Sequence, residues 1–219
     1  TQDRLGFSVA ISDDGNIVAV GAPRDDNNGN QSGSVEVHQY SGSGTSWSIL
    51  GSAINGEEAN DYLGDSGNLA LSGDGTIVAV GAYYNDGNGA NSGHVRVYLW
   101  NGSTWVQRGL DIDGEAAGDA SGISVSISNN GEILTIGASA NDGNGTSSGQ
   151  LRVYEWSGVA WVKKGIDIDG NAAGDLFGEN VSVSADGTFV AVGAPGANSN
   201  GNDAGTTTIY EIRTLGVLS

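Results

Sequence analysis

The run Ile17-Val18-Ala19-Val20-Gly21-Ala22 decides the fold of this chain, because close copies of it recur three times, at residues 77–82, 133–138 and 189–194. A turn glycine that follows Asp or Asn introduces each copy. These glycines, which lie 60, 56 and 56 residues apart, are Gly15, Gly75, Gly131 and Gly187. A run that is apolar at nearly every position predicts a strand buried on both faces. We therefore expect a repeated sheet that is covered on both sides by neighbouring sheets.

Three further runs accompany each copy and complete a unit of four short strands. In the second unit the third run spans residues 94–100 and the fourth spans residues 105–112, and a first run of the next unit follows at residues 124–127. Units of this length with four strands each are typical of propeller blades. We predict an all-β fold, a β-propeller with four visible four-stranded blades. The alternatives are part of a larger propeller and a β-solenoid array.

The predicted blades form one domain over residues 1–219. Their approximate bounds are 3–60, 61–118, 119–174 and 175–219. Residues 213–219 are the weakly marked fourth strand of the last blade, so the sequence leaves open whether four blades close into a ring. Open sheet edges invite pairing, which makes self-association an expected alternative to closure.

The first two runs of each unit resemble the FG-GAP repeat of integrin α-chain propellers and their microbial relatives. The resemblance rests on Phe177-Gly178 with Val192-Gly193-Ala194-Pro195, and on Leu5-Gly6 with Gly21-Ala22-Pro23. It implies an extracellular, integrin-like propeller. The family often carries a calcium loop between the first two strands, but residues 12–15 are too few for that loop. The family calcium assignment therefore does not extend to this position.

The charge of the chain excludes several functions. Asp and Glu number 26 against 8 Lys and Arg, which gives a formal net charge of −18. Such a surface repels nucleic acid and anionic lipid, so we expect neither nucleic-acid binding nor membrane insertion. The absence of cysteine rules out disulfides, thiolate metal sites and a cysteine nucleophile.

Two repeated polar sets are candidates for binding Ca²⁺, which prefers carboxylate and amide oxygens. They lie in the links between blades and in the long loops between the second and third strands, and both are expected on one face of the propeller. The candidate ligands are Asp61, Asp119 and Asp175 in the links, and Asp26, Asn28, Asp86, Asn88, Asp142 and Asn144 in the loops. The alternative is that these side chains satisfy their own backbone as Asx-turns. The expected cofactor is therefore none or Ca²⁺.

Residues suited to catalysis are few in this sequence. The chain has two histidines; His38 fills a repeat position, and His94 aligns with Ser34 and Gln150 at what we expect to be an exposed strand start. The acids at 111, 113, 167 and 169 are interpreted as charges that keep the outer edge of the blade from pairing with other chains. We predict no catalytic residues and no enzymatic activity.

The resulting prediction is a non-enzymatic adhesion or structural module outside the cell or on its surface. Such a module would form part of a cell-surface protein or a filamentous appendage, and its partners would be proteins or glycans. One alternative is a glycan-binding propeller lectin, with sugar stacked on Trp47, Trp105 and Trp161. The other alternative is a hydrolase on a propeller scaffold, which would need one cleft with clustered carboxylates.

Overall fold

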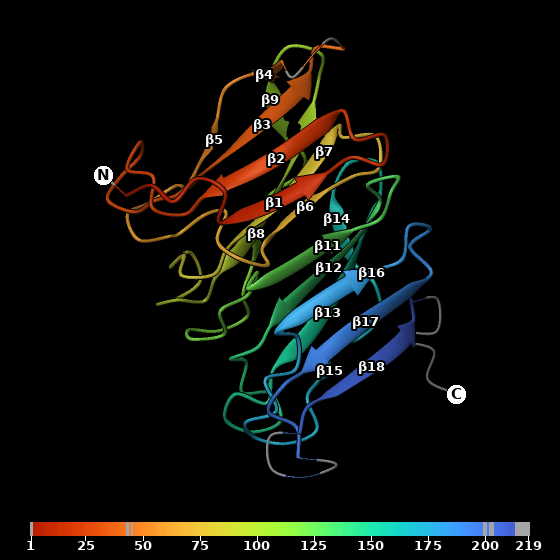
Figure 1. Ribbon diagram of the computed structural model, residues 1–219. Helices are drawn as coiled ribbons and strands as arrows, with labels where there is room; N and C mark the ends of the chain where they lie inside the picture. The colour runs from red at the N-terminus through yellow and green to blue at the C-terminus, as the bar shows by residue number, and fades with distance from the viewer. Residues whose placement is uncertain (1, 43, 45, 199–200, 202–203, 213–219) are drawn as a thin grey trace.

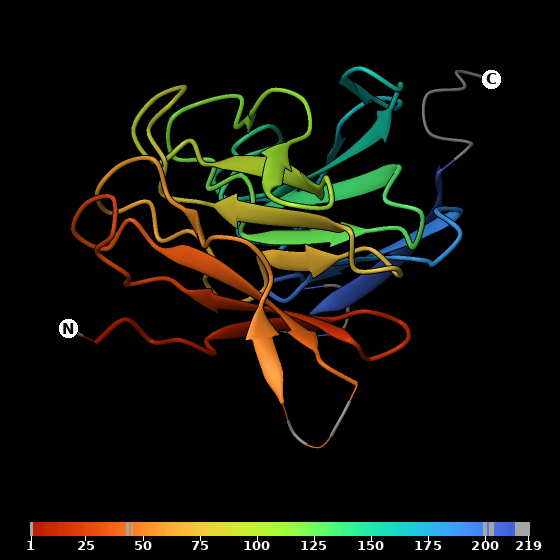
Figure 2. The same ribbon diagram turned by 90° about the horizontal axis from the view of Figure 1, so that it is seen from above.

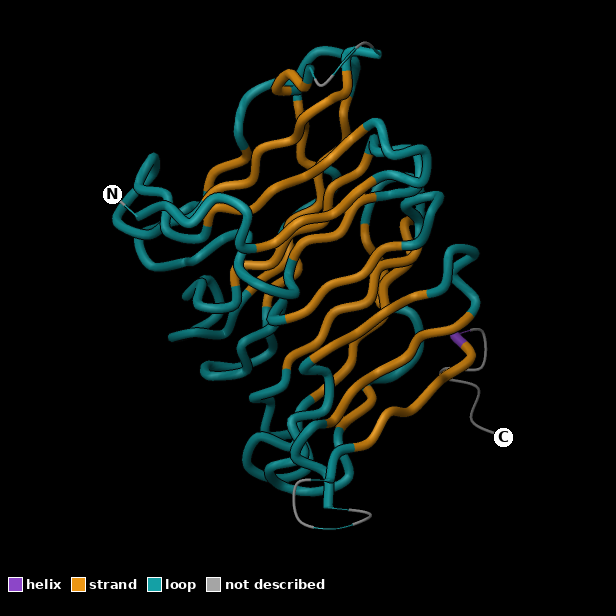
Figure 3. Tube along the Cα trace, in the orientation of Figure 1, coloured by secondary structure: helices purple, strands orange, loops and turns teal. Residues whose placement is uncertain are grey.

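The computed structural model describes residues 2–42, 44, 46–198, 201 and 204–212. Its strands form four antiparallel sheets, which we call blades 1 to 4. The blades follow one another in chain order, with blade 1 and blade 4 at opposite ends of the molecule (Figure 1). The strands of neighbouring blades run side by side and the loops gather at their ends (Figure 3).

Each of the first three blades has three full strands and an outer strand in two pieces. Blade 1 contains β1 (Ser8–Ile11), β2 (Ile17–Ala22), β3 (Ser34–Tyr40), β4 (Trp47–Ile49) and β5 (Ile54–Asn55). Blade 2 contains β6 (Leu69–Leu71), β7 (Ile77–Ala82), β8 (His94–Trp100), β9 (Trp105–Gln107) and β10 (Ile112–Asp113). Blade 3 contains β11 (Ser124–Ile127), β12 (Ile133–Ala138), β13 (Gln150–Trp156), β14 (Trp161–Lys163) and β15 (Ile168–Asp169).

Blade 4 is described as three strands, β16 (Asn180–Val183), β17 (Phe189–Ala194) and β18 (Thr206–Glu211). The fourth strand that we predicted at residues 213–219 lies outside the described residues. Within the ranges that the structure describes, no helix has the length and hydropathy that a membrane span requires.

Burial of the second strands follows from the position of each blade. Every residue of β7 and β12 is buried, because blades 2 and 3 lie between two neighbours (Figure 2). In β2 and β17 several residues are only partly buried. The described residues cover one face of blade 1 and one face of blade 4, so the predicted two-sided burial holds for the inner blades alone.

The hydrophobic core is divided into clusters that each join two consecutive blades. Ile17 and Val35 of blade 1 pack with Val78 and Val80 of blade 2 in the first cluster. The second cluster joins blades 2 and 3, and the third joins blades 3 and 4. Full burial of a Val, Leu or Ile side chain contributes about 1.5–3 kcal/mol, so the contacts between blades are the main source of stability in this fold.

A glycine near the end of the second strand in blades 1, 2 and 3 lets the next blade come close. A Cβ atom added there would overlap a glycine carbonyl oxygen of the following blade. The pairs are Gly21 with Gly64, Gly81 with Gly122, and Gly137 with Gly178. Any side chain at the first residue of each pair would therefore push two blades apart.

The outer strand differs from the single run that we predicted over residues 105–112. It is interrupted between β9 and β10, where Gly109 has a φ of +92°. The indole nitrogen of Trp161 in blade 3 donates a hydrogen bond to the Arg108 carbonyl at this break, over 2.8 Å. Trp105 binds the Leu50 carbonyl of blade 1 in the same way, over 2.7 Å. At each break, a tryptophan from the next blade thus donates a hydrogen bond to the backbone carbonyl where the outer strand is interrupted.

Candidate functional site

The long loops between second and third strands and the links between blades lie at the same end of the molecule, which we call the loop face. Asn88 connects the two, because its amide donates to the carbonyls of Gly114 and Glu115 over 2.8 and 3.0 Å. Asn28 and Asn144 make the equivalent pairs of bonds. The predicted juxtaposition of loops and links on one face is therefore present.

The predicted calcium ligands of the loop face use their side chains to hold backbone. Asp86 accepts a hydrogen bond from the backbone N–H of Asn91 over 2.7 Å, and Asp26 and Asp142 do the same in their loops. Asp119 is buried and accepts from the N–H of Ala116 over 2.9 Å, and Asp61 and Asp175 occupy equivalent positions. These are the contacts expected if the side chains satisfy their own backbone. Calcium binding by the same residues stays a prediction.

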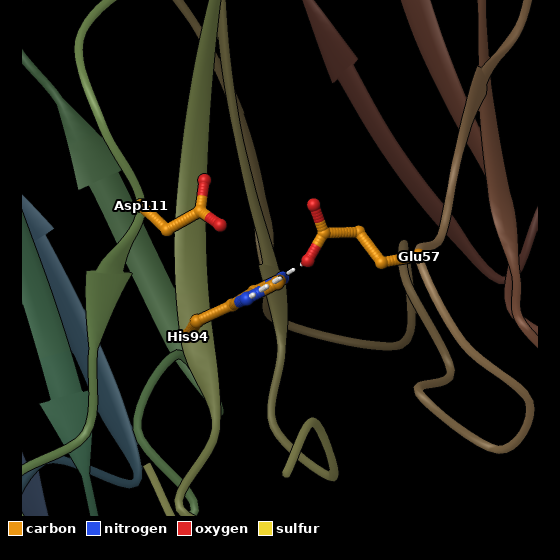
Figure 4. Close-up of side chains that lie close together, drawn as sticks. All are labelled: Glu57, His94 and Asp111. Atoms are coloured by element: carbon orange, nitrogen blue, oxygen red, sulfur yellow. Dashed lines mark ion pairs between the residues drawn. The ribbon is translucent and has the colours of Figure 1, made fainter. Parts of the chain in front are cut away.

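A different set of side chains comes together where blade 1 meets blade 2, a contact that we call the first boundary. Glu57 belongs to the link that follows β5, His94 begins β8, and Asp111 directly precedes β10. One ligand atom from each lies within 4.8 Å of the other two. The imidazole of His94 extends from its strand toward the Glu57 carboxylate, with Asp111 on the same side (Figure 4).

His94 is buried in this group, with 1% of its surface exposed, so the expected exposed strand start is wrong. Its Nδ1 lies 3.9 Å from Glu57 Oε2, beyond hydrogen-bond length. Its Nε2 has no hydrogen-bond partner among the described residues. Burial first, and then the charge of Arg96, lower the pKa of His94 to about 4. The ring is therefore neutral at physiological pH.

Glu57 and Arg96 form an ion pair across the first boundary. Arg96 Nη1 lies 3.2 Å from Glu57 Oε1, while Arg96 Nη2 donates to the Asn55 carbonyl over 2.8 Å. Partial burial raises the pKa of Glu57, and the carboxylates of Asp111, Asp61 and Asp113 raise it further against the opposing effect of Arg96. Burial is the largest of these effects, and Arg96 has the largest effect of the neighbouring charges.

The contact between blades 2 and 3, the second boundary, has the same framework with different side chains. Glu115 takes the position of Glu57, and Gln150 takes that of His94 and donates to Glu115 Oε2 over 3.0 Å. Lys163 replaces Gln107, with its Nζ 2.8 Å from Asp167 and 4.0 Å from Glu115. Among these side chains, the two boundaries therefore differ at two positions, His94 against Gln150 and Gln107 against Lys163.

Sequence reasoning missed this site although the signal was present. His94 differs from the residues at the same position in the other repeats, which are Ser34, Gln150 and Thr206. Asp111 was interpreted as a charge that protects the blade edge; the structure shows that it accepts a hydrogen bond from Gln107 and faces the imidazole of His94. The sequence signal was one of only two histidines, at a position that varies between repeats and in a chain rich in carboxylates.

The three tryptophans of the lectin alternative lie on the outer strands. Trp47 is 44% exposed and stacks at a tilt on Tyr40, with ring centroids 5.5 Å apart. Trp105 and Trp161 are partly buried and pack against the core clusters. Since their indole nitrogens bind carbonyls of the preceding blade, these two side chains brace the boundaries between blades.

Comparison with known proteins agrees with the repeat and the fold. A family model of the FG-GAP repeat matches residues 1–37, which confirms the predicted FG-GAP-like repeat. A search of curated proteins found no match. TolB from Acinetobacter baumannii is similar to this chain with a TM-score of 0.54 and 14% identity, over 94% of this chain and 41% of TolB.

Two further similar structures carry the names of lactonases. A protein assigned as a 6-phosphogluconolactonase from Bacteroides uniformis ATCC 8492 gives a TM-score of 0.61 at 12% identity, over 93% of this chain and 49% of that protein. The periplasmic gluconolactonase PpgL from Pseudomonas aeruginosa gives 0.57 at 13% identity, over 93% and 56%. The chain spans about half the length of these proteins. At this identity they show the shared fold, and the predicted all-β propeller is confirmed.

These comparisons contradict the prediction of a non-enzymatic adhesion or structural module. Structures that share the fold are named as enzymes, so a propeller of this kind gives no reason to exclude catalysis. The prediction also assumed that the blades are uniform. The first boundary breaks that uniformity with a buried histidine between carboxylates.

Proposed function

We propose that this chain provides the site of a propeller-scaffold hydrolase that opens cyclic esters, the lactone class of substrate. The site is the first boundary, with Glu57, His94, Arg96 and Asp111. The observation that carries the proposal is the buried imidazole of His94, which lies beside two carboxylates and whose Nε2 has no hydrogen-bond partner among the described residues. The lactone class is taken from the names of two structures with the same fold.

The side chains of the first boundary match the requirements of ester hydrolysis. A water molecule adds to the ester carbonyl carbon and loses a proton to the Glu57 carboxylate, whose side chain is 42% exposed. The negative charge that develops on the carbonyl oxygen is stabilised by the Arg96 guanidinium, which already lies beside Glu57. The ring C–O bond then breaks, and Glu57 returns the proton to the departing oxygen.

Asp111 and His94 act on Glu57 in this proposal. Asp111 keeps a second negative charge near the carboxylate, and the neutral imidazole of His94 occupies the space next to Glu57 Oε2. Both come from blade 2, whereas Glu57 comes from blade 1. Activity would therefore depend on the packing of these two blades.

The experiment is a rate measurement with glucono-lactone and related lactones in a pH-stat. The wild-type chain and Glu57→Gln are compared with Glu115→Gln, the matched variant at the second boundary. Loss of a positioned acid–base group costs about 10²–10⁴-fold in rate, so Glu57→Gln should be nearly inactive and Glu115→Gln should retain activity. A wild-type rate equal to the blank, or equal rates for both variants, would overturn the proposal.

We also propose an extracytoplasmic location for this activity. It is supported by the FG-GAP resemblance and by the periplasmic protein among the structures of the same fold. Cell fractionation with an antibody against the chain tests it, and recovery in the cytoplasmic fraction would contradict it.

A further inference from the structure

The second boundary contains a built-in cation between two carboxylates. The Lys163 ammonium lies 2.8 Å from Asp167 Oδ2 and 4.0 Å from Glu115 Oε1. Gln150 completes the group by donating to Glu115 Oε2 over 3.0 Å. Positive charge is therefore supplied by the protein itself where blades 2 and 3 meet.

The first boundary keeps the two carboxylates but replaces the groups around them. Glu57 and Asp111 correspond to Glu115 and Asp167. The position of Lys163 is taken by Gln107, which is uncharged, and the position of Gln150 is taken by His94. An amide that donates a hydrogen bond is thus exchanged for an imidazole whose nitrogen can bind a metal ion.

We propose that the first boundary binds one divalent transition-metal ion of the zinc class through Glu57, His94 and Asp111. The ion takes the electrostatic place that the Lys163 ammonium holds at the second boundary. A neutral imidazole with two carboxylates is a donor set suited to Zn²⁺ and related ions, and unlike the oxygen-only sets of Ca²⁺.

One ligand atom from each of the three side chains lies within 4.8 Å of the other two, so binding an ion requires the side chains to move closer together. His94 Nδ1 and Glu57 Oε2 lie 3.9 Å apart. Ligands at about 2.0–2.1 Å in a tetrahedral site are separated by about 3.3–3.4 Å. The half-exposed Glu57 side chain can close this difference, while its Oε1 keeps its contact with Arg96. His94 is 1% exposed, so its ring is fixed within the group, and its second nitrogen, Nε2, has no hydrogen-bond partner among the described residues.

The charge around the first boundary also favours a cation. Asp61 and Asp113 lie near enough to act on Glu57, in addition to Asp111. Arg96 supplies one positive charge to this group through its pair with Glu57. The inference does not depend on hydrolysis, because it concerns binding alone.

The test is isothermal titration of the EDTA-treated full chain with Zn²⁺, in the absence of substrate. We expect one site per chain. The variants His94→Gln and Gln107→Lys give the first boundary the composition of the second, and each should weaken Zn²⁺ binding by at least about 10-fold. The paired variant Gln150→His with Lys163→Gln makes the reverse change at the second boundary and should add a second site.

Circular dichroism confirms that each variant is folded before it is titrated. Absence of Zn²⁺ binding by the folded wild-type chain would overturn the inference. Binding that is the same in His94→Gln and in the wild type would also overturn it, because the ion would then lie elsewhere. Titration with Ca²⁺ should give no heat that depends on His94. Lactone hydrolysis is measured separately in EDTA. Hydrolysis by a chain that binds no Zn²⁺ would overturn this inference and leave the proposed hydrolase standing, whereas Zn²⁺ binding without hydrolysis would do the reverse.

Discussion

Lowering the pH should destabilise the chain through His94, and the size of this effect can be worked out from the burial of the ring. Burial lowers the pKa of His94 from 6.5 to about 4 in the folded protein. The unfolded chain therefore takes up a proton at this residue at a higher pH than the folded chain. Stability from the neutral ring is fully present above pH 6.5 and is lost as the pH falls toward 4.

The expected loss follows from the difference between the two pKa values. At about 1.36 kcal/mol per pKa unit, a depression from 6.5 to about 4 corresponds to about 3 kcal/mol as an upper estimate. His94→Gln removes the titrating ring but keeps a side chain that the repeat already uses at Gln150. The free energy of unfolding of this variant should depend less steeply on pH than that of the wild type.

The assay is urea unfolding in EDTA, followed by tryptophan fluorescence at several pH values between 4 and 6.5. Subtracting the curve of the variant from that of the wild type removes most of the contribution of the many carboxylates. The difference should fall by up to about 3 kcal/mol across this range. A difference that does not change with pH would refute the burial of a neutral ring at the first boundary.

Three further predictions concern the boundaries and the loop face. Trp161→Phe keeps an aromatic ring but loses the hydrogen bond to the Arg108 carbonyl, and should lower the free energy of unfolding by about 1 kcal/mol in urea titrations. Asn144→Ala removes two hydrogen bonds to the link after β15, and should cost about 1–2 kcal/mol by the same measurement; an unchanged midpoint would show that the link holds without them. The predicted calcium site of the loop face should give binding heat and a higher melting temperature when Ca²⁺ is added to EDTA-treated protein; neither effect in the wild type would exclude it.

The repeat and its strands were predictable because their signals are local. The apolar run at residues 17–22 and its copies fix the second strands, and the turn glycines fix their starts. The break in the outer strand was not predictable from its own residues. It depends on Trp161, which belongs to another blade and meets the Arg108 carbonyl only when the two blades are packed.

The candidate site was harder to predict for the same reason. The sequence shows that His94 differs from Ser34 and Gln150, but not that the ring is buried or that it lies 3.9 Å from Glu57 of the preceding blade. The exchange of Lys163 for Gln107 is visible in an alignment of the repeats. The structure adds that Lys163 lies between the carboxylates of Glu115 and Asp167, so the exchange removes a positive charge from this group.

The central claim is that blades 1 and 2 pack closely enough to bring Glu57 to His94. The most direct measurement compares the melting temperatures of Gly21→Ala and Gly193→Ala. A Cβ at Gly21 would overlap the Gly64 carbonyl of blade 2, whereas a Cβ at Gly193 has no heavy atom nearer than 3.7 Å. We predict that Gly21→Ala loses about 1–3 kcal/mol or more and melts well below the wild type, and that Gly193→Ala melts at or above it. Equal melting temperatures for the two variants would contradict the packing on which the site depends.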